Sequence, residues 1–167
     1  MAPVGADDAV VVLLGSLPGE ASLAAQRYYA HPQNQFWRLL GGAIGEELAS
    51  LDYDRRLARL DVRGIALWDV VAEATRDGSL DGAIRGATAN PLTEFVARHP
   101  RLAGIGFNGQ TAARIGRQAI GPALDRLVAI DLPSSSPAYT IPFATKAACW
   151  AVLGDLVLGA ENATLRR

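Results

Sequence analysis

Cysteine is almost absent from this chain, since Cys149 is the only one among 167 residues. A single thiol excludes an internal disulfide and any cysteine-rich zinc or iron–sulfur centre. Histidine is nearly as scarce: the only two are His31 and His99, and each is followed by proline. Without a nearby pair of carboxylates they make a poor metal site, so we expect no metal. The scarcity of cysteine also favours a cytoplasmic protein.

Long apolar runs and a basic leader are missing as well. No hydrophobic stretch reaches the ~18 residues of a membrane-spanning helix, and the start, MAPVGADDAV, lacks the features of a signal peptide. We therefore expect no membrane association. The net charge of −1 argues against a strongly basic nucleic-acid binder. Residues 98–146 hold six Lys/Arg against two Asp/Glu, which indicates either a phosphate-facing surface or, as we favour, an ordinary solvated helix face.

What the chain does contain is a series of short apolar runs separated by helical patterns. The apolar runs, typical of strands buried on both faces of a sheet, cover residues 9–15, 64–68, 102–107 and 126–132. The helical patterns cover residues 34–41, 46–60, 90–100, 109–121 and 142–158, with Asn34 and Asn90 placed as helix caps. Strands that alternate with helices predict an α/β fold with a parallel sheet covered on both faces. We expect a single domain over residues 1–167, with an ordered core at about 9–158.

Polar loops follow three of the four predicted strands. They are GSLPGEAS at 15–22, NGQ at 108–110 and PSSSPAYT at 133–140. In open α/β sheets, ligands bind beyond the carboxyl ends of the strands. Loops of this composition also leave backbone N–H groups available to oxygen atoms. Each loop alone is compatible with an ordinary turn, but their convergence at one edge of the sheet predicts a site. Asn108, the first residue of the NGQ loop, has two possible roles. It shapes the loop through a left-handed φ, as we favour, or it contacts the ligand.

The same loops exclude several common chemistries. The first loop lacks the Gly-Lys-Ser/Thr ending of a P-loop and the Gly-x-Gly-x-x-Gly spacing of a dinucleotide site, so we expect no cofactor. The chain also has no Gly-x-Ser-x-Gly elbow of a serine hydrolase. Lys146 is the only lysine, and its place just after the Ser-rich loop favours contact with phosphate or solvent over a Schiff base.

Residues 28–37, YYAHPQNQFW, gather four aromatic side chains and an asparagine within ten positions. The stretch is compatible with an aromatic core hinge or with a pocket around a flat ligand. We assign Tyr28, Phe36 and Trp37 to the core. Asn34 is compatible with a helix cap, with a pocket residue, or with both.

Four ordered motifs resemble those of the uracil-DNA glycosylase superfamily: GSLPGEAS, HPQNQFW, GFNGQTA and LPSSSPAY. The similarity extends over residues 9–158, and LWDVVAEATRDGSLDGAI at 67–84 resembles the hypoxanthine-DNA glycosylase branch, family 6. The resemblance implies a three-layer α/β/α fold with a central four-stranded parallel sheet. It also implies a monofunctional glycosylase of base-excision repair that needs no metal. Its partner would be DNA containing deaminated bases in the cytoplasm, and we expect a monomer.

The resemblance also implies roles for particular residues. The first loop would bind the flipped base and the DNA around it, and the Ser-rich loop would enter or pinch the DNA. Tyr29 occupies the place of an aromatic residue that stacks on the base. The implied base-binding residues are Gly15, Ser16, Leu17 and Tyr29. The implied DNA-binding residues are Pro18, Gly19, Ser134, Ser135, Ser136, Pro137 and Lys146.

Leu17 departs from the family pattern. Most members carry Asn or Asp there, which positions or activates water, and leucine can do neither. The hypoxanthine branch shares this departure and is expected to use the asparagine of the HPQNQFW-like segment instead. In this chain that catalytic residue would be Asn34. Leu132 likewise replaces a histidine that starts the second loop in other members. Three hypotheses therefore stay open: a hypoxanthine glycosylase, a glycosylase of mismatched uracil, and a non-catalytic binder of damaged or single-stranded DNA.

Overall fold

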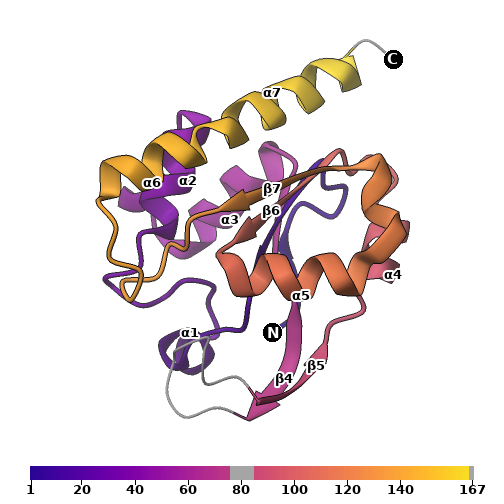
Figure 1. The fold of residues 1–167 in the computed structure, drawn as a ribbon. Helices are drawn as coiled ribbons and strands as arrows, with labels where there is room; N and C mark the ends of the chain where they lie inside the picture. Colours follow the sequence, from indigo (N-terminus) through magenta and orange to yellow (C-terminus); the bar gives the residue numbers. More distant parts are fainter. Residues whose placement is uncertain (76–84, 166–167) are drawn as a thin grey trace.

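Five strands form the central sheet of the computed structural model, which describes residues 1–75 and 85–165 (Figure 1). The strand order is β1-β3-β2-β6-β7. The four predicted strands are confirmed, and three pairings join them in parallel: β2 (Val11–Gly15), β3 (Ile65–Asp69), β6 (Gly104–Asn108) and β7 (Val128–Leu132). The predicted number of strands was one too low, because β1 (Val4–Gly5) pairs antiparallel with β3 at the edge.

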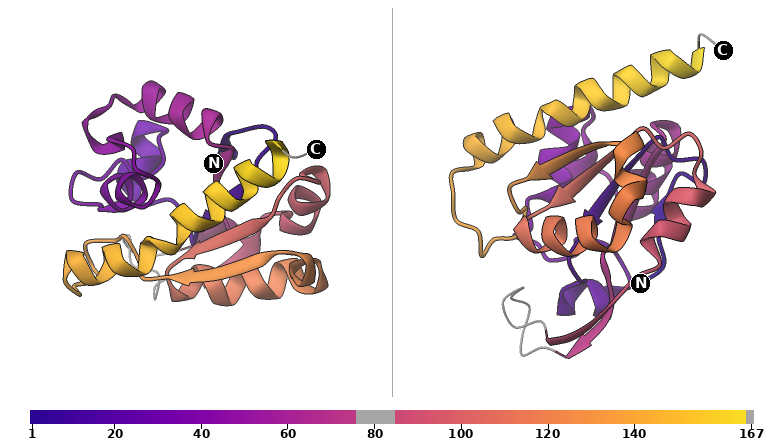
Figure 2. Two further views of the ribbon diagram at one scale, coloured as in Figure 1. Left: turned by 90° about the horizontal axis from the view of Figure 1, so that it is seen from above. Right: turned by 45° about the vertical axis from the view of Figure 1, so that its right-hand side comes forward.

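Helices cover both faces of this sheet, so the predicted three-layer α/β/α architecture is confirmed (Figure 2). Their bounds are α1 (Glu20–Ala25), α2 (Phe36–Ile44), η1 (Leu48–Ser50), α3 (Tyr53–Val62), α4 (Leu92–Arg98), α5 (Gln110–Ile120), η3 (Gly121–Arg126), α6 (Phe143–Trp150) and α7 (Val152–Leu165). Phe107 and Gly116 bring β6 and α5 together on one face, and α7 packs on the other. There a Cβ on Gly104 would lie 2.4 Å from Leu156 Cδ2, so the glycine allows the close approach of the helix.

A hairpin of β4 (Val71–Thr75) and β5 (Arg85–Ala89) extends from the end of β3 (Figure 1). The sequence did not predict it. The family-like segment 67–84 falls partly on this hairpin, and residues 76–84 of it lie outside the described residues. Within the part of the chain that the structure describes, no helix is both long enough and apolar enough to span a membrane.

The ordered structure is longer at both ends than the predicted core of residues 9–158. At the start, the Tyr28 hydroxyl donates to the Ala2 carbonyl at 2.9 Å, and Trp68 Nε1 donates to the Met1 carbonyl at 3.0 Å. At the other end, α7 continues to Leu165. A two-residue strand has no periodicity, which is why β1 left no signal in the sequence.

Candidate active site

A cavity of about 1090 Å³ opens at the carboxyl edge of the sheet. Its walls come from the loops that follow β2, β6 and β7, from the last residue of β3, from α5 and from the segment between α1 and α2. This is the convergence that the polar loops predicted. The predicted site residues that line the cavity are Gly15, Ser16, Leu17, Pro18, Gly19, Tyr29, Asn34, Ser134, Ser135, Ser136 and Pro137. Lys146 does not line it.

The first loop is held against the end of β3 by backbone hydrogen bonds. The N–H of Val70 donates to the carbonyl of Gly15 at 2.8 Å, and the N–H of Val71 donates to that of Ser16 at 3.0 Å. Pro18 is buried and lines the cavity, so its contact with DNA, as predicted, would be made from the cavity wall. Leu17 is half-buried and adds an aliphatic surface to the same wall. The loop therefore forms a fixed, mainly apolar side of the cavity.

Tyr29 lies at the cavity with its ring supported from behind by Phe36. The two rings are nearly parallel, with an interplanar angle of 8° and 3.6 Å between their centroids. Phe36 is fully buried and Trp37 is 4% exposed, which confirms that both belong to the core. Tyr29 has a φ of +54°, a conformation that non-glycine residues seldom adopt. Since Phe36 covers one face of the ring, a flat ligand can stack only on the opposite face.

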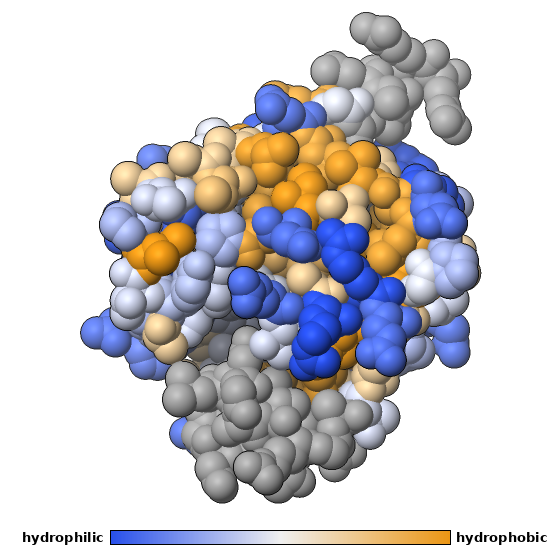
Figure 3. Space-filling view, in the orientation of Figure 1, coloured by the Kyte–Doolittle hydropathy of each residue, from blue (hydrophilic) through white to orange (hydrophobic). Residues whose placement is uncertain are grey.

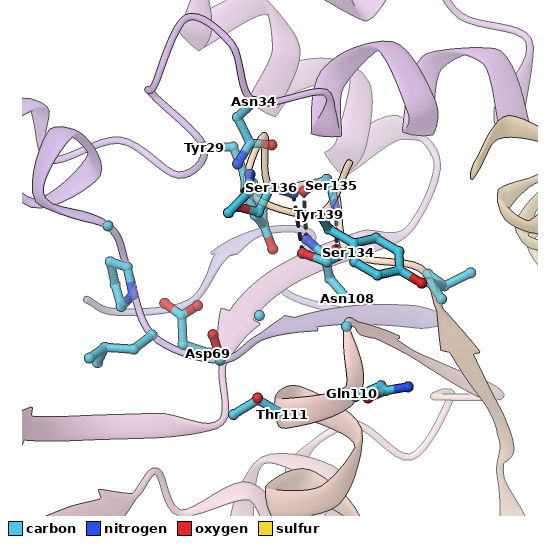
Figure 4. A pocket seen from close by; sticks show the side chains of 18 of the residues that line it. Tyr29, Asn34, Asp69, Asn108, Gln110, Thr111, Ser134, Ser135, Ser136 and Tyr139 are labelled. Atoms are coloured by element: carbon cyan, nitrogen blue, oxygen red, sulfur yellow. Dashed lines mark hydrogen bonds between the residues drawn. The ribbon is translucent and has the colours of Figure 1, made fainter. Parts of the chain in front are cut away.

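Asn34 both caps a helix and lines the cavity. Its side-chain oxygen Oδ1 accepts a hydrogen bond from the N–H of Phe36, the first residue of α2, at 3.0 Å. The N-cap position is Gln35, so the helix begins one residue later than a cap at Asn34 predicted. Figure 4 shows the carboxamide over the cavity, near Tyr29 and Ser136. The amide oxygen has a second lone pair and the nitrogen has two donors, so the group can still hold a water molecule.

Ser135 is not available for the phosphate contact that the sequence predicted. It is fully buried, its N–H donates to Asn108 Oδ1 at 2.8 Å, and its hydroxyl accepts from Asn108 Nδ2 at 2.9 Å (Figure 4). Asn108 thus shapes the loops, as predicted, but not through a left-handed φ. The positive φ, +100°, belongs to Gly109.

The other two serines of the loop keep their hydroxyls near the cavity. Ser134 Oγ accepts from the N–H of Ser136, and Ser136 Oγ accepts from the N–H of Ala138, both at 3.2 Å. Both residues are half-buried and line the cavity, while Pro137 is exposed. A hydroxyl that accepts a hydrogen bond can still donate its own proton to an anion. Ser134 and Ser136 therefore remain candidates for contacts to phosphate.

Lys146 supports the Ser-rich loop from inside and does not face the DNA side, so the prediction for this residue was wrong. It is 1% exposed, and Nζ donates to the carbonyl of Ser136 at 3.2 Å. The same atom lies 5.4 Å from the centre of the Tyr139 ring. Burial lowers the pKa of the ammonium group.

Most positive charges of residues 98–146 are engaged within the protein. Arg117 forms an ion pair with Asp131 at 2.7 Å, and Arg126 donates to two backbone carbonyls, at 3.1 Å and 2.8 Å. The excess of positive charge in this block is therefore largely used for contacts within the protein. Arg114 differs, because it is exposed on α5 and lines the cavity. Figure 3 shows a hydrophilic area over α5, below an apolar area over β7 and α7.

Replacing Lys146 with methionine is expected to leave the salt dependence of DNA binding unchanged. The buried ammonium group neutralises no phosphate, so no counterion release depends on it. Replacing exposed Arg114 with alanine is the matched comparison, and it should reduce the slope of log K against log salt by about one if Arg114 contacts a phosphate. The measurement is a salt titration of binding to an inosine-containing oligonucleotide. A reduced slope for the Lys146 variant would restore the original prediction.

Asp69 is a buried residue of the cavity wall that was not among the predicted site residues. It is the last residue of β3, is 3% exposed and lines the cavity. Asn90, predicted to cap the next helix, instead donates from Nδ2 to the Asp69 carbonyl at 2.8 Å. Burial first, and then the negative charge of Asp69, raise the pKa of the neighbouring Tyr28. The sequence did contain a signal for this residue: it is an aspartate directly after an apolar run, at the end of a strand where ligands bind.

These features define a class of protein before any comparison is made. A parallel α/β/α sheet carries, beyond its strand ends, a cavity with a supported aromatic ring, an amide and a buried carboxyl group. Such a site is suited to a flat polar molecule, held by stacking on one side and by hydrogen bonds at its edge.

Residues 2–154 match the model of the Uracil DNA glycosylase superfamily, and the chain belongs to this family. It is similar to two proteins named Hypoxanthine DNA glycosylase. The protein from Methanosarcina barkeri is 41% identical over 108 residues, which cover 65% of this chain and 68% of that protein. The protein from Methanosarcina acetivorans is 39% identical over 128 residues, 77% of this chain and 79% of that protein.

The fold is shared with a solved relative. A solution NMR structure of a Methanosarcina acetivorans protein assigned as a uracil DNA glycosylase superposes with a TM-score of 0.81 and 34% identity, covering 93% of this chain and 96% of that one. The predicted family is thus confirmed, and the chain is a DNA glycosylase.

Proposed function

We propose that this glycosylase hydrolyses the bond between hypoxanthine and deoxyribose in DNA, acting on a nucleotide flipped out of the helix. The observation that carries the proposal is that the Tyr29 ring, backed by Phe36, and the Asn34 carboxamide line one cavity. The two similar hypoxanthine DNA glycosylases support hypoxanthine as the base.

Tyr29 would offset part of the cost of flipping. Extrusion of a base costs a few kcal/mol, and less at a mismatch such as inosine in a weak pair. Stacking of a base on an aromatic side chain returns about 1–3 kcal/mol. Because Phe36 holds the tyrosine ring in place, little side-chain freedom is lost when the base arrives. The hydroxyls of half-buried Ser134 and Ser136 would hold phosphates that flank the flipped nucleotide.

Asn34 would hold the attacking water in line with the sugar carbon. An amide is too weak a base to take the proton fully, so its contribution is positioning. As the bond breaks, positive charge develops on the sugar and negative charge on the base. Gly15 and Ser16 line the cavity, and their backbone N–H groups would stabilise the leaving base as an oxyanion hole does. Together these contacts replace the side chain that is absent at Leu17.

An alkali-scission assay with three oligonucleotides tests the proposal. They carry inosine, uracil opposite guanine, or no damaged base, and alkali cleaves the strand wherever a base has been removed. We expect cleavage mainly with inosine. Cleavage mainly with uracil would favour the second hypothesis, for which the solved uracil DNA glycosylase relative is the supporting observation. Tight binding with no cleavage of any strand would contradict catalysis and leave a damage-binding protein.

A further inference from the structure

Asp69 places a buried carboxyl group in the wall of the cavity. It is 3% exposed, and its Oδ1 lies 2.6 Å from the point where a Cβ on Gly15 would stand. The Tyr29 hydroxyl lies 3.0 Å from the same point. Figure 4 shows the Asp69 carboxyl group pointing into the cavity, with Asn34 on the opposite side. The carboxyl group therefore lies at the hydroxyl end of the ring on which the base would stack.

The surroundings of Asp69 hold it in this position. Its carbonyl accepts the hydrogen bond from Asn90 Nδ2, and the next residue, Val70, is bonded through its N–H to Gly15 at 2.8 Å. On the register of the sheet, Gly15 and Asp69 are direct partners across β2 and β3. The backbone at Asp69 is thus held on both sides at a rigid strand end. A side chain placed in this way has the precision that base recognition needs.

The order of groups from rim to floor decides which edge of the base meets Asp69. A flipped nucleotide stays joined to the DNA through its sugar, so the bond to the sugar lies at the rim, near half-buried Asn34. In a purine, the atoms farthest from that bond are those of the edge with N1 and the group on carbon 6. Buried Asp69, which lies across the cavity from Asn34, therefore meets this edge.

We propose that the carboxylate of Asp69 accepts a hydrogen bond from the N1–H of hypoxanthine and so distinguishes hypoxanthine from adenine. The inference rests on the proposed function. Deamination of adenine converts N1 from an acceptor into a donor, and a carboxylate binds only the donor. Adenine would place the lone pair of N1 against the carboxylate, and the two groups repel each other in a buried site. Uracil and xanthine also carry a ring N–H beside a carbonyl, so one contact suits the deaminated bases. Guanine keeps its N1–H, so this contact does not exclude guanine.

A cycle of protein and substrate changes tests this contact. Single-turnover excision is measured for wild type, Asp69→Ala and Asp69→Asn on oligonucleotides with deoxyinosine, N1-methyl-deoxyinosine or 7-deaza-deoxyinosine. We expect N1 methylation to slow wild type about tenfold or more, as for a lost hydrogen bond to a charged group. It should slow Asp69→Ala much less, because the partner is gone and there is room for the methyl group. Loss of N7 should slow all three proteins by the same factor.

Three results would overturn the inference. If the effect of the Asp69 variants depends on N7 of the substrate, Asp69 acts as an acid that protonates the purine. If the variants slow excision of every substrate equally, Asp69 is a base for the water or a structural group. Absence of any effect of either variant would also overturn it. Asp61→Asn, which removes an exposed carboxylate of α3, is the control for charge and should match wild type. If wild type itself does not excise hypoxanthine, the proposed function fails; if it does and the N1 coupling is absent, only this inference fails.

Discussion

Alanine in place of Asn34 is expected to slow single-turnover excision of hypoxanthine at least ~10²-fold, as for loss of a preorganised polar group at the reacting centre. The carboxamide lines the cavity at its rim, and Leu17 offers no polar substitute. The structure adds a second consequence. The variant also loses the hydrogen bond from the N–H of Phe36, which is worth about 1 kcal/mol at a helix start. We therefore expect the melting temperature to fall by about 2–4 °C.

Asn34→Ser separates the two roles of this residue. The serine hydroxyl can accept the hydrogen bond of the helix start, but it is too short to replace the carboxamide over the cavity. Its melting temperature should lie close to that of wild type while its excision rate stays low. Full specific activity of Asn34→Ala, together with a large fall in melting temperature, would leave Asn34 with the capping role alone.

The sequence predicted the parallel strands because their physical signal is strong. A strand buried on both faces is apolar at nearly every position, and the residues of β2, β3 and β6 are all buried, with Asp69 and Asn108 as the polar last residues of β3 and β6. Elements without such a signal were missed. β1 has two residues, and β4 and β5 have short mixed sequences without an apolar run, as do the six residues of α1. These elements depend on contacts with the rest of the fold, which no local pattern reports.

The site was predictable in place but not in every detail. Parallel strands end at one edge, so the loops after β2, β6 and β7 had to meet. The sequence does not say which side of a loop a side chain takes. For this reason Ser135 and Lys146, both expected on the DNA, proved to be buried supports of the loop. Asp69 was missed for the opposite reason, since a lone aspartate after an apolar run looks like any strand end.

Replacing Gly15 with alanine is expected to reduce the excision rate by about 10²-fold, because a misplacement of about 1 Å at the reacting groups costs that much. The new Cβ would stand 2.6 Å from Asp69 Oδ1 and 3.0 Å from the Tyr29 hydroxyl, so both groups must move. Gly15 is needed for this close approach and not for its φ, which is not positive. Overpacking of this kind costs about 1–3 kcal/mol, or about 2–12 °C in melting temperature.

Gly42→Ala is the matched control for this change, since a Cβ on Gly42 meets nothing within 4 Å and the residue lies on the exposed side of α2. It should keep full activity and gain slightly in stability through its higher helix propensity. The double variant Gly15→Ala with Asp69→Ala tests the cause directly. If the clash with the carboxyl group destabilises Gly15→Ala, the same change should cost much less in the Asp69→Ala background. Equal costs in both backgrounds would mean that the new methyl group meets something other than Asp69, and the floor of the cavity would then need another description.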